Sequence, residues 1–114
     1  MKRVSILIRG APFSSWNSWE GLRTALGLTL RDHRVRVIFI EEGVYNLLPL
    51  SPKSLGLRDF DQFLKTLVEL EIPLIVEREA VEERGLKDLA CNPQVISREE
   101  IQDMLREDTS VIAF

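Results

Sequence analysis

Short apolar runs rich in β-branched residues alternate along the chain with longer segments in which apolar residues recur every three or four positions. The short runs predict strands, because continuous apolar stretches without alternation are typical of strands buried on both faces. We expect these strands at residues 4–8, 35–40, 74–76, 94–96 and 110–114. Strands separated by helical segments favour parallel pairing, because the crossover between two parallel strands is usually a helix.

The first segment between strands predicts an amphipathic helix. Trp19, Leu22 and Leu30 share one helical face. Asn17 or Ser18 precedes this face, and either side chain is a good candidate for the cap at the helix amino end. The sequence therefore predicts a strand, a helix and a second strand in its first 40 residues.

Further helices are predicted in the second half of the chain. Apolar positions over residues 60–70 define one helical face, and a shorter helix is expected over 80–84. Gly85 should end that helix, since glycine adopts the left-handed conformation at a helix end most easily. Ser97 and Glu100 form a capping box, which predicts the start of a last helix.

Five strands alternating with helices predict a single α/β domain over residues 1–114, with three layers and a parallel sheet. The chain is 45% hydrophobic and 29% charged, which is normal for a globular domain. A domain of this length can bury a core without metal ions or disulfides, and we expect neither a metal nor another cofactor.

Charge and hydropathy narrow the class of partner. Fifteen Lys and Arg residues stand against 18 Asp and Glu residues, a net charge of -3, so the balance favours neither nucleic acid nor an anionic membrane. The apolar run at residues 4–8 is too short for a signal peptide, and no run approaches the length of a membrane helix. We therefore expect a cytoplasmic protein.

Ligands of open parallel sheets bind beyond the carboxyl ends of the strands, which directs attention to Arg9, Glu41, Glu77 and Ser97. The segment 9–15 lacks the spaced glycines of a dinucleotide site and the Gly-Lys-Ser/Thr of a P-loop, so nucleotide binding is disfavoured. The next edge segment begins with two adjacent carboxylates, and paired carboxylates serve in acid–base catalysis or bind cations.

Glu41 and Glu42 are these carboxylates, and neighbours on an extended strand point to opposite faces. We therefore favour a structural interpretation, in which they precede a short helix over residues 44–48. His33, the single histidine, lies at the other end of the predicted sheet, where a solvated position near a helix end is expected. A histidine-dependent catalytic triad is therefore disfavoured.

Cys91 is the single cysteine and the one side chain capable of covalent sulfur chemistry. A lone cysteine excludes an internal disulfide and a two-cysteine redox site. Lys87 is the only nearby cation that would lower the pKa of this thiol, so we favour a buried or incidental thiol. A catalytic role for Cys91 stays open as the alternative.

Several motifs resemble the DsrE/DsrF-like sulfur-relay family, and in particular its DsrF/TusC branch. They are Ala11-Pro12, Glu20-Gly21-Leu22 and the run from Val37 to Pro49, which contains Glu-Gly-Val-x-x-Leu-Leu-Pro. Arg84-Gly85-Leu86 and the terminal strand Val111-Ile112-Ala113-Phe114 are similar to the ends of the same branch. Residues 51–57 and 87–95 match poorly.

The resemblance implies a five-stranded parallel sheet in the flavodoxin-like order 2-1-3-4-5. It also implies a subunit of an oligomer with DsrE/TusD-like and DsrH/TusB-like proteins, often a heterohexamer. Members of the family pass persulfide sulfur between cysteines, toward tRNA 2-thiouridine synthesis or in dissimilatory sulfur oxidation. The relay cysteine of the DsrE/TusD-like sister lies just after the third strand, and Glu77 takes that position here.

A carboxylate does not hold sulfane sulfur, so the resemblance implies a non-catalytic subunit that acts by packing. Residues 44–57 are unusually apolar for a connecting region, which suggests contacts with sister subunits, although several of these leucines would equally close over the core. The interface candidates are Trp16, Tyr45, Leu47, Leu48, Leu50 and Leu55. Two alternatives remain open: a small sulfurtransferase with Cys91 as persulfide carrier, and a homo-oligomeric small-ligand or regulatory domain.

Overall fold

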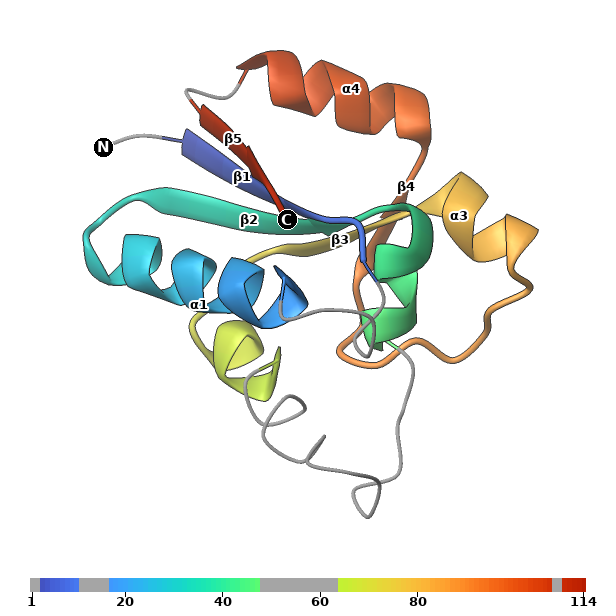
Figure 1. Cartoon of the computed structure of the whole chain (residues 1–114), viewed down its shortest axis with the longest axis horizontal. Helices are drawn as coiled ribbons and strands as arrows, with labels where there is room; N and C mark the ends of the chain where they lie inside the picture. Colours follow the sequence, from blue (N-terminus) through green and yellow to red (C-terminus); the bar gives the residue numbers. More distant parts are fainter. Residues whose placement is uncertain (1–2, 11–16, 48–63, 108–109) are drawn as a thin grey trace.

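The computed structural model describes residues 3–10, 17–47, 64–107 and 110–114 of the chain. All five predicted strands are present, and the helices lie between them (Figure 1). The elements are β1 (Arg3–Ile8), α1 (Asn17–Leu30), β2 (Arg34–Phe39), the 3-10 helix η1 (Glu41–Leu47), β3 (Leu74–Glu77), α3 (Arg78–Glu83), β4 (Gln94–Ile96), α4 (Arg98–Glu107) and β5 (Ser110–Ala113). Residues 64–69 form a further helix before β3.

Some element boundaries differ from the prediction. Helix α1 already begins at Asn17, so Asn17 and Ser18 lie inside the helix and the predicted cap is wrong. Of the helix expected over 60–70, the described part is 64–69. Such differences of a few residues are common at helix ends, because the first turn has few intrahelical hydrogen bonds to define it.

The sheet is parallel throughout, and its strand order is β4-β3-β2-β1-β5. The order 2-1-3-4-5 expected from the resemblance is therefore wrong. The chain moves in one direction from β1 through β2 and β3 to β4, and then returns to the far side of β1 for β5. Because crossovers between parallel strands are right-handed, reversing the direction moves the connecting helix to the opposite face.

The helices accordingly divide between the two faces of the sheet, which makes three layers (Figure 1). Helix α1, helix 64–69 and α3 cover one face, and α4 is the one helix of the described residues that lies on the other. The larger core cluster contains the buried residues Val4, Ile6, Ile8, Leu22, Ala25, Val35, Val37, Phe39, Val44, Leu47, Leu64, Leu67, Ile72, Leu74, Val76 and Ala80. The cluster under α4 is built around Ile38, Ile75 and Ile101.

Three helices end in the same hydrogen-bonded arrangement, known as a Schellman motif. The residue after the cap is left-handed in each case: Asp32 after α1, Glu71 after helix 64–69 and Gly85 after α3. At the end of α3, Gly85 N–H donates to Glu82 and Leu86 N–H donates to Val81. The prediction that Gly85 ends this helix is confirmed.

Among the helices that the structure describes, none combines the length and the apolar character needed to cross a bilayer.

Candidate functional site

The region of interest is the edge of the sheet formed by the carboxyl ends of β3 and β4. Helix α3 leaves β3 toward the face that carries α1, whereas α4 leaves β4 toward the opposite face. Two neighbouring strands whose connections diverge in this way define the switch point of a doubly wound sheet, where ligands of such folds usually bind. The polar residues at this point are therefore the candidate site.

Glu77, the last residue of β3, places a carboxylate at the switch point. The residue is only 4% exposed. Its Oε2 accepts a hydrogen bond from Nε of Arg98 at 2.7 Å, and its Oε1 accepts a longer one from the backbone N–H of Glu41 at 3.4 Å. A buried carboxylate is stable where a cation and N–H donors replace the lost water, and both are present here.

Arg98 opens α4 and holds Glu77 from the solvent side. Its side chain is 51% exposed, so the guanidinium stays partly hydrated while its Nε contacts the buried carboxylate. The hydrogen bond to Glu77 and the charge of that carboxylate raise the pKa of Arg98 above its ordinary value. Arg98 therefore stays charged at every physiological pH.

Glu79 in α3 closes the amino end of α4 against external anions. Its two carboxylate oxygens accept the backbone N–H of Arg98, at 2.9 and 3.1 Å. This hydrogen bond is the main reason why the pKa of Glu79 is lowered. Ser97 Oγ accepts the N–H of Glu100 at 3.2 Å, which confirms the serine half of the predicted capping box. The side chains of Glu79 and Ser97 thus already occupy backbone N–H groups of the kind that bind phosphate at helix amino ends in other proteins.

Helix η1 packs against the end of β1 at the same edge. Gly43 is required there, because a Cβ at this position would lie 1.9 Å from the carbonyl oxygen of Ile8. The buried amide of Asn46 donates to the carbonyl oxygens of Gly10 and Gly43, at 2.9 and 2.8 Å. The Glu-Gly-Val-x-Asn-Leu part of the resemblance motif therefore fixes the junction of β1, β2 and η1.

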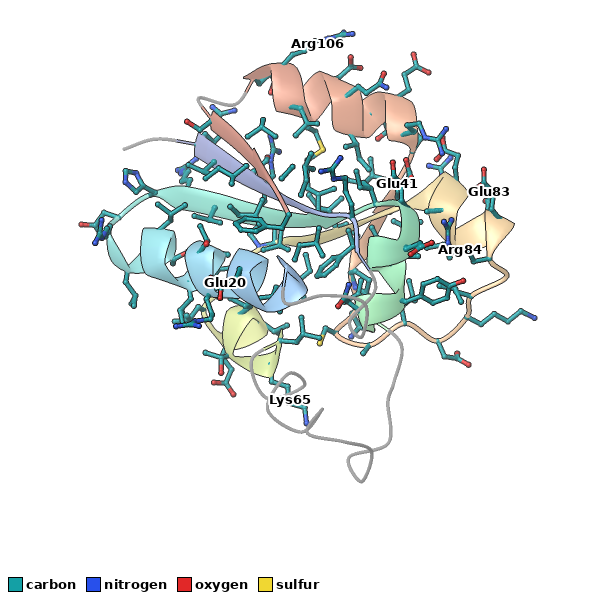
Figure 2. All side chains as sticks on the ribbon, viewed as in Figure 1. Glu20, Glu41, Lys65, Glu83, Arg84 and Arg106 are labelled. Carbon is teal, nitrogen blue, oxygen red and sulfur yellow. The ribbon has the colours of Figure 1, made fainter. Side chains whose placement is uncertain are left out.

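Glu41 and Glu42 begin η1 and are both exposed. Glu41 has a left-handed backbone conformation with φ of 51°, which turns the chain directly after β2. Figure 2 shows the Glu41 side chain at the β2 end of η1, on the side of α4. The short helix starts at Glu41 and not at residue 44 as predicted, so the two carboxylates form its first turn and do not precede it. Within the described residues, no group of three metal-ligating side chains comes together.

Cys91 lies at the opposite end of the sheet from Glu77. It precedes β4 and lines a hollow of about 250 Å³ together with Pro73 and Leu74, which lie at the start of β3. The thiol residue is partly buried against the larger core cluster. His33 lies at this same amino edge, in a separate hollow of about 380 Å³. Neither residue belongs to the switch point.

The interface candidates have different outcomes. Trp16, Leu48, Leu50 and Leu55 lie outside the described residues. Leu47 is fully buried in the core of this chain, so its assignment to an interface is wrong. Its side chain packs in the larger core cluster and is 0% exposed, so it has no surface left to contact a partner.

Tyr45 is half-buried, and the guanidinium of Arg84 lies 5.9 Å from the centre of its ring. Its role at an interface stays a prediction. The sequence interpretation missed Arg98 and Glu79 as partners of the Glu77 edge. The sequence gives little indication of this role, because both are ordinary charged residues near predicted strand ends. Only the strand order brings them to the Glu77 edge.

These observations define a three-layer α/β domain with a doubly wound parallel sheet and, at its switch point, a buried carboxylate held by a half-exposed guanidinium. The chain belongs to the DsrE/DsrF-like family, whose sequence model matches residues 2–114.

Curated relatives carry the DsrF and TusC names. The chain is 34% identical over 88 residues to the intracellular sulfur oxidation protein DsrF of Allochromatium vinosum, a match that covers 75% of this chain and 65% of that relative. It is 30% identical to a TusC homolog of Vibrio parahaemolyticus over the whole of both chains.

Solved structures support the fold. The ychN protein of E. coli aligns with a TM-score of 0.87 at 20% identity, and the alignment covers 100% of both chains. A conserved protein of unknown function from Bacteroides thetaiotaomicron aligns with a TM-score of 0.73 at 12% identity, over 99% of this chain and 95% of the other. The strand order 4-3-2-1-5 thus occurs in a fold that resembles that of the ychN protein.

Proposed function

We propose that this chain is a non-catalytic, DsrF/TusC-like subunit of a cytoplasmic sulfur-relay complex. It supports the transfer of persulfide sulfur by its partners, either in tRNA 2-thiouridine synthesis or in dissimilatory sulfur oxidation. One observation carries the proposal. The side chain at the end of β3 is the carboxylate of Glu77, and it is already engaged by Arg98 and by the N–H of Glu41.

The chemistry of a relay explains why this observation matters. Sulfane sulfur moves when a thiolate attacks a persulfide, so each carrier needs a cysteine sulfur that is exposed to the next carrier. Glu77 has no sulfur and is nearly inaccessible, with its side chain 6% exposed. The Glu77 position is therefore a structural element of this subunit and not a carrier.

Cys91 does not replace the missing thiol at this edge. It lies at the amino ends of β3 and β4, whereas Glu77 lies at the carboxyl end of β3. Cys91 is partly buried, and it packs against the larger core cluster. This setting supports a passive role for Cys91.

A subunit without a carrier contributes through its contacts. The partners proposed are a DsrE/TusD-like subunit, which supplies the relay cysteine, and a DsrH/TusB-like subunit. The names of the DsrF and TusC relatives support this place in an assembly. Tyr45 and the candidates in 48–55 are the residues proposed to contact these partners.

Co-expression tests the proposal directly. The tagged chain should purify together with both sister subunits as a complex several times larger than 13.1 kDa. Relay of sulfur through that complex should be lost when the chain is omitted and should be unchanged in Cys91→Ser. Failure of the chain to bind either sister, or full relay without it, would refute the proposed role.

A further inference from the structure

A hollow of about 380 Å³ lies at the amino edge of the sheet, away from the switch point. Its lining comes from the end of α1, the start of β2 and residues 70–73, which precede β3. Pockets that hold small molecules have volumes of about 300–1,000 Å³, so this hollow has room for a small ligand. The proposed relay role does not use it.

Part of the lining is apolar and still open to solvent. Leu70 is 43% exposed, and Pro73 is exposed as well. Val35 and Ile72 also line the hollow, and both are buried and belong to the larger core cluster. A ligand with a small apolar group would remove the exposed part of this surface from water.

The charged part of the lining is mainly positive. Arg3, Arg34 and Arg36 line the hollow, and Glu71 is the one carboxylate among its described lining residues. This excess of positive charge is local, because the whole chain has a net charge of -3. The hollow therefore attracts an anion, whereas the protein as a whole does not.

Two of these arginines are direct neighbours in the sheet. Arg3 of β1 is in register with Arg34 of β2, and paired residues of adjacent strands project to the same face. Like charges placed in this way repel each other. Glu107 Oε2 lies 3.7 Å from Nη1 of Arg3, but both side chains are more than half exposed, so this ion pair is weak. An anion that contacts both guanidiniums would offset their repulsion.

Arg34 has its hydrogen-bond donors available for such an anion. The residue is exposed, and its side chain forms no hydrogen bond or ion pair with the described residues. It is not needed to cap α1, because the carbonyl oxygen of Leu28 already accepts the backbone N–H groups of Arg31 and His33. Arg34 is therefore the side chain on which binding in this hollow depends most.

We propose that the hollow binds a phosphate monoester with a small apolar group. The phosphate contacts Arg3 and Arg34, and the apolar group covers Leu70 and Pro73. Phosphate fits two guanidiniums better than a carboxylate does, because it has three acceptor oxygens and a charge of about -1.5 to -2 at neutral pH.

Arg36 adds a fixed positive charge to the same site. Its Nε donates to Ser5 Oγ and its Nη2 donates to the carbonyl oxygen of Met104, both at 2.9 Å. None of these residues belongs to the switch point or to the proposed contacts with sister subunits. The ligand site therefore goes beyond the proposed function, and either one can fail without the other.

Titration of the full, isotope-labelled chain with phenyl phosphate, followed by NMR, tests the site. The backbone N–H signals of Val35 and Ile72 should shift, with a Kd on the order of 1 mM. Inorganic phosphate should bind about threefold more weakly, because it leaves the apolar surface uncovered.

Three variants separate the charged part of the site from the apolar part. Arg34→Gln should weaken the binding of phenyl phosphate about fivefold, since it removes a charged donor. Leu70→Ser should weaken phenyl phosphate about threefold and leave inorganic phosphate unchanged. Glu71→Gln should strengthen the binding of both about twofold, because it removes the opposing charge.

Arg23→Gln is the matched control, since Arg23 is an exposed arginine of α1 that does not line the hollow. It should bind phenyl phosphate like the unmodified chain, and the dispersion of each NMR spectrum checks that the variant is folded. If Arg34→Gln is unfolded, the effect of Glu71→Gln decides the result. Equal effects of Arg34→Gln and Arg23→Gln would overturn the proposal, and so would equal affinities for the two phosphates or an absence of shifts at the hollow.

Discussion

Burial and charge oppose each other at Glu77. Removing a carboxylate from water is costly unless a cation and hydrogen-bond donors replace the water. Arg98 lowers this cost because it remains half-exposed, so only one member of the pair loses most of its hydration. The pair also ties the end of β3 to the start of α4, which holds the two sides of the switch point together.

Replacing Arg98 with Ala should therefore destabilise the fold, because it leaves the Glu77 carboxylate buried without its cation. We expect the melting temperature to fall by roughly 5 °C. Arg106→Ala is the control, since Arg106 forms only a solvent-exposed pair with Asp103. Thermal denaturation followed by circular dichroism measures both. Equal, small effects of the two substitutions would show that Arg98 does not support Glu77.

Glu79 should make stability depend on acid pH. The N–H of Arg98 lowers the pKa of Glu79 in the folded chain below its ordinary value of 4.5. A lowered pKa means that the folded state favours the ionised form, so this stabilisation is present above pH 4.5 and is lost as the pH falls through the folded pKa.

Urea denaturation of Glu79→Gln over this acid range tests the linkage. The variant should be less stable than the unmodified chain near neutral pH, and the difference should shrink below pH 4.5. Glu99→Gln serves as the control, because Glu99 is exposed and lies in the same helical turn as Arg98. A constant difference between Glu79→Gln and the unmodified chain from neutral to acid pH would contradict the assignment.

The Glu77 position was predictable from the sequence, but its partners were not. An apolar run followed by Glu77 indicates the carboxyl end of a strand, and the structure places it there. Arg98 lies 21 residues later, and its contact depends on how β4 and α4 are placed around β3. No local pattern encodes that placement, so the ion pair becomes visible only in three dimensions.

At the scale of elements, two helix ends carry backbone strain that a glycine would relieve. Glu71 and Asp32 adopt left-handed backbone conformations that glycine would adopt at lower cost. After α3, the left-handed position of the Schellman motif is occupied by a glycine, Gly85. The sequence signals only Gly85, because glycine after a helix is a known stop signal and glutamate is not. The periodicity that predicted the helices therefore did not locate all of their ends.

Glu71→Gly should stabilise the chain by about 0.5–1 kcal/mol, as the relief of the left-handed strain exceeds the added freedom of the unfolded chain. Glu69→Gly, two residues earlier and at the last position of the helix, should instead destabilise it, by about 0.5 kcal/mol. Urea denaturation at neutral pH gives both free energies of unfolding. The same sign for the two substitutions would contradict the role given to Glu71.

At the scale of the whole molecule, hydrophobic patterning predicted five strands and their parallel pairing but not their order. Every strand of a buried parallel sheet presents apolar side chains on both faces, so the pattern does not distinguish a central strand from its neighbour. The order depends on which face each crossover helix covers. Here α4 takes the opposite face from α1 and α3, and this choice places the switch point between β3 and β4.

The central claim is that this chain supports sulfur transfer without carrying sulfur. The most direct test is the intact mass of every chain after the assembled complex has reacted with a low-molecular-weight persulfide. We expect an added sulfur atom, about 32 Da, on the cysteine-bearing sister subunit and none on this chain. An added sulfur on this chain that disappears in Cys91→Ser would contradict the account and make Cys91 a carrier.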